Sequence, residues 1–389
     1  MATTNEEIRD LLIKHQVALI RGAEDKADQI VALLAAAHKD LRERIDKRLA
    51  KIVEEGFDPG PTTTARLLKI EDEIRGILNR PHREIDAELR QYLGDTARSS
   101  ARFTKDLFAD KVVAVVNFGL PAVGVLKEIV DHNPIEGGVL KDWLAKLERD
   151  DVERAMAAIR IGLVQGEGVR QIVARVRKGG EITRRAAEML VRTVANGVFN
   201  QARQRFFEAN AKYLKEVVWI STLDSRTCPR CGWLDGRRYP VDSGPRPPEH
   251  PSCRCTVAPA IDGRLFGNRP LKRSTEEDLL REYAEREGID PVKRRASLPR
   301  GHKGKFDKFS RKRVRELTGQ TPASTTFEEF LEKQSPAFQD KVLRREVADW
   351  YRKGKLKLRD LFDQNGDIYS IDDLLRRHPD LSRNERRAA

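Results

Sequence analysis

The N-terminal part of the chain carries the periodic apolar pattern of long helices. The sequence Thr4-Asn5-Glu6-Glu7 is a capping box, in which Thr and Glu three residues apart satisfy the first free N–H groups of a helix. Apolar residues follow mostly at helical spacing as far as the Pro- and Gly-rich segment 56–64, and a second helical pattern covers residues 65–93. We therefore predict a helical hairpin that buries one narrow stripe, either on a partner or on the rest of this chain. The apolar positions of the first helix are Ile8, Leu11, Leu12, Leu19, Ile30, Leu34, Leu41, Ile45 and Ile52.

Helical patterns also fill residues 140–216, where glycines mark the expected breaks. The segment Gly166-Glu167-Gly168 separates two predicted helices, and Gly179-Gly180 separates another two. Residues 217–221 have the pattern of a short strand, and residues 259–270 have that of a linker. The predicted fold class is therefore mainly α, with long helices and a small, metal-stapled α+β core near residues 217–260.

The same patterns divide the chain into four expected parts. Residues 1–110 form the long-helix hairpin region, and residues 111–265 form a core that contains the loop 228–255. Residues 266–324 are expected to be a basic linker, and residues 325–389 a C-terminal helical tail. At 389 residues, a chain of two or more domains is expected.

The composition is polar and basic. Hydrophobic residues make up 39% and charged residues 35% of the chain, and the formal net charge is +13. Such a surface favours anionic partners: nucleic acid, anionic lipid or an acidic protein face. The longest uncharged run, residues 112–126, is shorter than the roughly 20 apolar residues of a spanning helix. We interpret it as a buried core segment, with a membrane-contacting segment as the alternative, and we predict no stable membrane span.

All four cysteines lie within 28 residues, with a histidine among them. The spacing is Cys-x2-Cys, then eighteen residues, then His-x2-Cys-x-Cys. The start of the chain lacks the apolar region of a secretory signal, so we expect a reducing compartment, where disulfides are rare. Four clustered cysteines in a reducing compartment indicate a metal site rather than two disulfides or four ordinary buried thiols. The candidate ligands are Cys228, Cys231, His250, Cys253 and Cys255.

Five candidates exceed the four tetrahedral ligands of a structural zinc ion. We expect Cys228, Cys231 and His250, completed by either Cys253 or Cys255, since residues two apart on a strand face the same side. A site made of the four cysteines alone is the alternative. A catalytic zinc ion keeps an open position for water, so this surplus of ligands favours a structural ion. The Gly- and Pro-rich loop between the two ligand pairs has little core of its own and needs such an ion to hold it.

Two further features bear on the metal chemistry. Gly232, directly after the second cysteine, is expected at positive φ, as such knuckles often require. His82 and Glu84 form the His-x-Glu pair that opens a zinc deaminase signature, but they lie far from the cysteines. We interpret this pair as part of a solvated helix face. A zinc-dependent nuclease or hydrolase is the alternative function, for which an open metal position would be diagnostic.

The segment 217–255 combines a Trp-containing strand with Asp-x-Arg-Thr-Cys-x-x-Cys, Leu-Asp-Gly and Pro-Pro-x-His-Pro-x-Cys-Arg-Cys. This pattern resembles the signature of the phage Mu F-like minor head proteins, the head morphogenesis proteins of tailed phages. The resemblance covers roughly residues 140–380, although the family usually has Leu-Gly where this chain has Leu343-Arg344. The matching residues are Trp219, Asp224, Arg226, Thr227, Cys228, Cys231, Leu234, Asp235, Gly236, Pro247, Pro248, His250, Pro251, Cys253, Arg254 and Cys255.

The resemblance implies a structural component of the virion and not an enzyme. It implies a place at the portal vertex or in the capsid interior, reached after assembly in the host cytoplasm. The implied partners are the portal protein and the major capsid or scaffolding protein, with roles in head assembly and in DNA packaging or delivery. A free, non-specific DNA-binding accessory protein is a further alternative.

Basic residues are concentrated in the second half of the chain. The net charge is +3 over residues 1–220 (37 basic less 34 acidic) and +10 over residues 221–389 (37 less 27). Segment 293–315 holds eleven Lys or Arg residues and one acidic residue, Asp307. We predict a sequence-independent, salt-sensitive contact with phage genomic DNA, with a solvated linker as the alternative. The candidate contacts are Lys293, Arg294, Arg295, Lys303, Lys305, Arg311, Lys312, Arg313 and Arg315.

Overall fold

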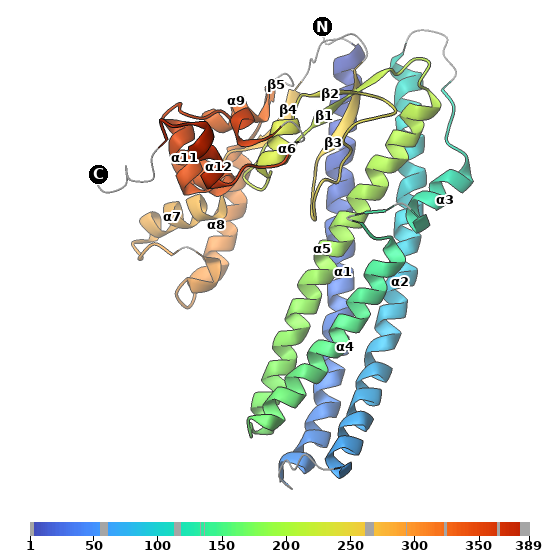
Figure 1. The fold of residues 1–389 in the computed structure, drawn as a ribbon, viewed down its shortest axis with the longest axis vertical. Coiled ribbons are helices and arrows are strands. Elements are labelled where there is room, and N and C mark those ends of the chain that lie inside the picture. The colour runs from blue at the N-terminus through green and yellow to red at the C-terminus, as the bar shows by residue number, and fades with distance from the viewer. Residues whose placement is uncertain are drawn as a thin grey trace. The chain divides into compact units, whose positions relative to one another are not determined.

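A computed structural model of the chain describes residues 4–54, 61–112, 118–132, 134–135, 137–260, 268–292, 294–322, 325–363 and 366–381 (Figure 1). The chain divides into two compact units. The helical unit contains Lys14–Asn210 together with Pro247–Cys253. The mixed unit contains Met1–Ile13, Ala211–Arg246 and Arg254–Ala389. The predicted division into four domains stays a prediction.

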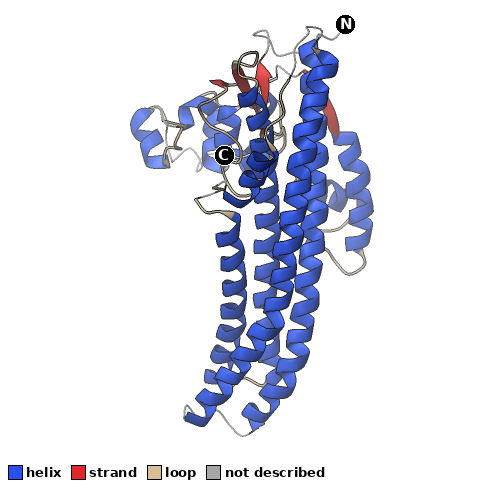
Figure 2. Cartoon of the chain, turned by 90° about the vertical axis from the view of Figure 1, so that its right-hand side faces the viewer, coloured by secondary structure: helices blue, strands red, loops and turns tan. Residues whose placement is uncertain are grey.

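The helical unit is built on four long helices that run side by side (Figures 1 and 2). Their apolar stripes form two clusters, one around Ile30, Leu89 and Val198 and the other around Ile45, Ile74 and Ile159. The predicted mainly helical fold is thus confirmed, and no described helix is long and apolar enough to span a membrane. The helices are α1 (Thr4–Glu54), α2 (Pro61–Lys111), α3 (Val123–His132), α4 (Leu140–Val164) and α5 (Val169–Ala209).

Two helices run further than their sequence patterns predicted. α2 continues past residue 93 to Lys111, and its buried stripe runs on through Ala97, Ala101 and Phe108. α5 passes through Gly179-Gly180 without a break, so the predicted helix boundary there is wrong. A Cβ atom at Gly180 would lie 2.8 Å from Nδ1 of His38, so this glycine permits close packing inside a continuous helix. The predicted break at Gly166-Glu167-Gly168 is present, and the turn at residues 56–64 lies largely outside the described residues.

A buried polar cluster joins all four long helices at one level. The carboxylate of Asp151 on α4 accepts hydrogen bonds from Nε2 of His38 (2.9 Å), Nε2 of His82 (3.1 Å) and Oγ1 of Thr183 (2.7 Å). These four side chains come from α1, α2, α4 and α5 and are all buried. The interpretation of His82 as part of a solvated helix face is therefore wrong. His82 lies on the buried stripe of α2, where its ring is paired with the carboxylate of Asp151 inside the bundle.

The mixed unit contains two small antiparallel sheets and short helices. The first sheet has the order β2-β1-β3, formed by β1 (Glu216–Ile220), β2 (Arg238–Pro240) and β3 (Thr256–Ala260). Val217 on β1 pairs with Tyr239 on β2 and Pro259 on β3. Strand β1 agrees with the predicted strand at 217–221, and the sheet frames both ends of the cysteine-containing loop. Helix α6 (Pro229–Leu234) lies within that loop.

The segment predicted as a basic linker contains regular structure. It holds β4 (Asn268–Lys272), α7 (Glu276–Glu287), the 3-10 helix η1 (Arg295–Ser297), α8 (His302–Leu317) and β5 (Thr318–Pro322). Tyr283 and Phe306 pack edge to face between α7 and α8, with ring centroids 5.4 Å apart. The Pro-containing strand β4 pairs antiparallel with β5.

The C-terminal tail folds around an apolar cluster that includes Phe327, Phe338 and Trp350. Arg344 joins two of its helices at φ +65° and ψ +145°, at the position where the resemblance implies glycine. L-residues rarely adopt this backbone conformation, which costs about 1–3 kcal/mol. The tail elements are α9 (Phe327–Glu332), α10 (Pro336–Leu343), α11 (Arg345–Arg352), the 3-10 helix η2 (Leu358–Leu361) and α12 (Ile371–Arg377).

The Asp151 cluster makes the stability of the bundle depend on pH. Burial alone raises the pKa of Asp151, but the hydrogen bonds from His38, His82 and Thr183 outweigh it and hold this pKa well below its ordinary value. A lowered folded-state pKa gives a stabilisation that is complete above about pH 5 and declines as the pH falls below about 4. Asp151→Asn should lower the free energy of unfolding at pH 7 by about 2–4 kcal/mol and flatten this acid dependence.

Urea denaturation followed by circular dichroism at pH 7 and pH 3.5 measures both effects. Asp150→Asn is the matched control, because Asp150 pairs with Lys146 and Arg154 nearer the surface. The control should cost less than about 1 kcal/mol. Equal losses in the two variants would contradict the role assigned to the buried cluster.

Candidate functional site

The first cysteine pair is positioned by a short helix. Cys228 caps α6, its sulfur accepts the backbone N–H of Cys231 at 3.4 Å, and Pro229 occupies the first helical position. Gly232 lies inside this helix and not at positive φ, so that prediction is wrong. A Cβ atom there would lie 2.4 Å from Cδ1 of Phe327, so glycine is needed because a ring packs directly on the helix.

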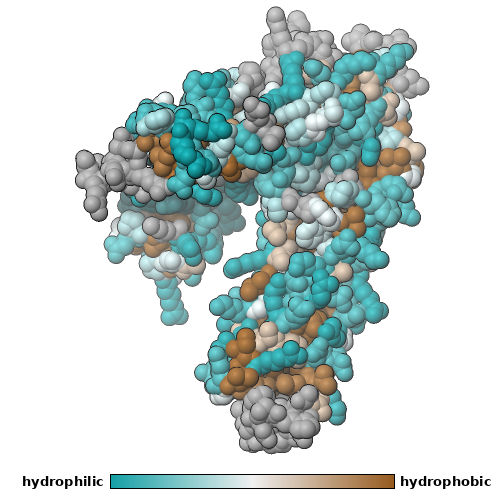
Figure 3. All heavy atoms as spheres, viewed as in Figure 1, coloured by the Kyte–Doolittle hydropathy of each residue, from teal (hydrophilic) through white to brown (hydrophobic). Residues whose placement is uncertain are grey.

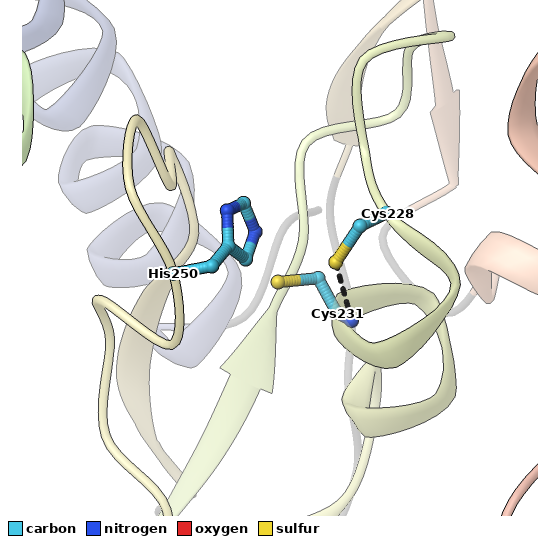
Figure 4. A group of neighbouring side chains, drawn as sticks. All are labelled: Cys228, Cys231 and His250. Carbon is cyan, nitrogen blue, oxygen red and sulfur yellow. Dashed lines mark hydrogen bonds between the residues drawn. The ribbon is translucent and has the colours of Figure 1, made fainter. Parts of the chain in front are cut away.

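All five predicted ligands come together at this helix. The ligand atoms of Cys228, Cys231 and His250 lie within 4.8 Å of one another, and so do those of Cys231, Cys253 and Cys255. Figure 4 shows the imidazole of His250 facing the two sulfur atoms of the first group. Cys231 is common to both groups and is buried, as are Cys253 and Cys255. This arrangement of thiols and imidazole can hold a metal ion.

The ring of His250 is oriented by the backbone carbonyl of the next residue. Its Nδ1 lies 2.9 Å from the carbonyl oxygen of Pro251. A carbonyl can only accept, so Nδ1 carries the proton and Nε2 is left as the lone-pair nitrogen that a metal requires. A tight turn follows, in which the N–H of Cys253 donates to the carbonyl of His250 at 3.1 Å. This backbone hydrogen bond places His250 and Cys253 in one turn of the chain.

A buried ion pair joins the two arms of the loop. Arg254 makes a bidentate contact with Asp224, in which the Nη1–Oδ2 and Nη2–Oδ1 distances are 2.5 and 2.7 Å. Burial raises the pKa of Asp224, but the hydrogen bonds and charge of Arg254 outweigh it and hold the pKa below its ordinary value. The carboxylate also accepts the N–H of Arg226, which fixes the turn before Cys228. The motif residues Asp224 and Arg254 thus set the approach of both cysteine pairs.

A second buried carboxylate fixes the Leu-Asp-Gly part of the motif. Asp235 accepts the N–H of Ser221 at 2.7 Å and the N–H of Phe327 at 2.8 Å. The first contact ties the end of α6 to strand β1, and the second ties it to the start of α9. Gly236 follows at φ +79°, a conformation that favours glycine. Sequence periodicity gave no signal for the contact with Phe327, since the partners lie 92 residues apart.

The predicted DNA contacts lie around η1 and α8, and many are already paired. Arg295 makes two contacts with Asp307, at 2.6 and 2.5 Å. Arg313 contacts Glu282 and Glu316, and Lys305 lies 3.9 Å from Glu287. Exposed positions include Arg294, Lys303, Arg311 and Lys312; Lys293 and the side chain of Arg315 lie outside the described part of the chain. DNA contact by this segment stays a prediction.

Comparisons with known proteins agree with this geometry. Residues 153–258 match the family described as Phage Mu protein F like protein, a range that runs from α4 through the loop to β3. The minor head protein GP7 of Bacillus phage SPP1 is 24% identical over 286 residues, which cover 68% of this chain and 90% of that protein. No solved structure gives a significant match. The motif, the family match and this relative together show that the chain is similar to the Mu F-like minor head proteins.

Proposed function

We propose that this chain is a head morphogenesis protein that acts at the portal vertex or on the inner face of the capsid. The observation that carries the proposal is the cysteine and histidine loop, which lies within the range matched by the family and whose ligand atoms form two groups that share Cys231. Its partners there are the portal protein and the major capsid or scaffolding protein, and phage DNA is a further partner. In this position the protein assists head assembly and the packaging or delivery of DNA.

We further propose that the loop holds a structural zinc ion through Cys228, Cys231, His250 and Cys253. The thiol of Cys255 donates to Oγ of Ser221 at 3.6 Å, which gives this sulfur another partner. The tight turn from His250 favours Cys253 as the fourth ligand. Four protein ligands leave no open position for a water nucleophile, which favours a structural role over the zinc-dependent nuclease or hydrolase.

The zinc proposal predicts a stoichiometric and stabilising ion. Protein purified without chelator should contain about one zinc per chain by elemental analysis. Removal by a chelator should lower the melting temperature by at least about 5 °C, because metal binding energy at such a site is folding energy. Cys228→Ser and Cys253→Ser should both lose the ion, whereas Cys255→Ser, the matched control, should keep it. Metal-free protein with an unchanged melting curve would exclude this account.

The structural role predicts fixed incorporation into heads. Quantitative mass spectrometry of purified heads should find the protein in constant copy number relative to the portal protein. Deletion of residues 1–93 should reduce incorporation, because this removes α1 and most of α2 from the bundle.

Glu249→Gln is the control for catalysis, because it changes a carboxylate beside His250 without removing a candidate ligand. Its infectious yield should remain near that of the wild type. Loss of infectivity by a Glu249→Gln variant that still enters heads would instead favour an enzyme.

A further inference from the structure

A polar pocket of about 560 Å³ lies within the mixed unit, beside α6. It is lined by residues of α6, η2 and α12 and of the segments beside them. None of these residues belongs to the metal cluster or to the basic segment 293–315. The lining consists of Trp233, Arg237, Arg359, Asp360, Phe362, Asp363, Tyr369 and Arg377.

Two of the three arginines are stacked on aromatic rings. The guanidinium carbon of Arg237 lies 3.6 Å from the ring centroid of Trp233, and that of Arg377 lies 4.2 Å from the centroid of Tyr369. Nε of Arg237 also donates to the carbonyl of Trp233 at 2.9 Å. Stacking holds a guanidinium plane in place while leaving N–H groups at its edge available to an oxyanion.

The aromatic floor of the pocket is itself fixed. The rings of Trp233 and Phe362 have centroids 5.4 Å apart. Gly366 packs against the tryptophan so closely that a Cβ atom there would lie 2.8 Å from the ring. Its carbonyl accepts a hydrogen bond from Arg230 of α6. The arginines therefore stand on a preorganised base, which lowers the entropy lost when they bind a ligand.

The charges in the pocket favour one class of anionic ligand. Three arginines face two carboxylates, Asp360 and Asp363, so the lining has a net charge of +1. A nucleic acid strand presents one phosphate after another and would be repelled by both carboxylates. Arg237 lies over the ring of Trp233 and Phe362 packs against the same ring, so both contacts compete with base stacking there. A peptide can place its carboxylates at the arginines and leave neutral backbone beside the aspartates.

We propose that this pocket binds an acidic peptide segment of a partner protein. Carboxylate side chains of the segment are held by the edges of Arg237 and Arg377, and Arg359 at the rim completes the site. Its neutral backbone lies beside Asp360 and Asp363. This contact is separate from the zinc proposal and does not depend on where the protein sits in the head.

Fluorescence anisotropy with the full-length protein tests the proposal. The probe is a labelled peptide in which glutamate and glycine alternate, called the Glu-Gly peptide below. The double variant Arg237→Gln/Arg377→Gln removes the stacked guanidinium groups. The double variant Arg238→Gln/Arg376→Gln removes the same charge from the next residues, whose contacts are with Glu216 and Asp373 outside the pocket. The pocket variant should raise the dissociation constant of the peptide at least about tenfold, and the control variant should raise it by less than about threefold.

Competition distinguishes the classes of ligand. Unlabelled Glu-Gly peptide should displace the probe, whereas oligothymidylate of the same length should do so only at much higher concentration. Equal weakening in the two double variants would reduce the effect to net charge and overturn the proposal. Tighter, pocket-dependent binding of oligothymidylate would overturn it in favour of nucleic acid, and an absence of saturable binding of the Glu-Gly peptide would also refute it.

Discussion

The convergence of four thiols and one imidazole is the constraint on which the loop 228–255 depends. Between its two ligand pairs the chain is rich in glycine and proline, and few of its side chains can form a core. The buried contacts of Asp224 with Arg254 and of Asp235 with two backbone N–H groups fix the ends of the loop. Within these ends the ligand atoms already lie close together. A bound ion would then convert proximity into a fixed geometry, at little further cost in chain entropy.

The helical unit is stabilised in a different way, because its long helices supply their own apolar core. A stripe of similar aliphatic residues fixes the contact but leaves the register of one helix against another weakly defined. The carboxylate of Asp151 has partners on three other helices. A shift of α4 by one turn would bury it unpaired, and a shift of any other of these helices would remove one of its hydrogen bonds. We infer that this cluster selects one register, since an unpaired buried charge is costly.

Sequence alone predicted the parts of the fold that arise from local periodicity and from the ligand motif. Helical spacing indicated α1 and the start of α2, and the apolar segment 217–221 indicated β1. Features that depend on distant partners were missed. Gly180 and Gly232 were read as backbone signals, whereas each makes room for a side chain from elsewhere, His38 and Phe327.

The same limit applies to charged and polar residues. His82 looked like part of a polar helix face because its partner, Asp151, is 69 residues away. The charge of segment 293–315 suggested a linker, but its basic residues also pair with acidic residues of α7 and α8. The five ligand candidates were identifiable because their residue types and spacing carry the chemistry directly. At Arg344 the turn forms although the residue is not the glycine that the resemblance implies.

X-ray absorption spectroscopy at the zinc edge tests the central claim most directly, because it counts the atoms around the ion in the intact protein. The account predicts three sulfur atoms at about 2.3 Å and one nitrogen atom at about 2.0 Å, with no water in the coordination shell. A shell containing water oxygen, or one dominated by nitrogen and oxygen, would contradict a closed structural site and support a catalytic ion instead.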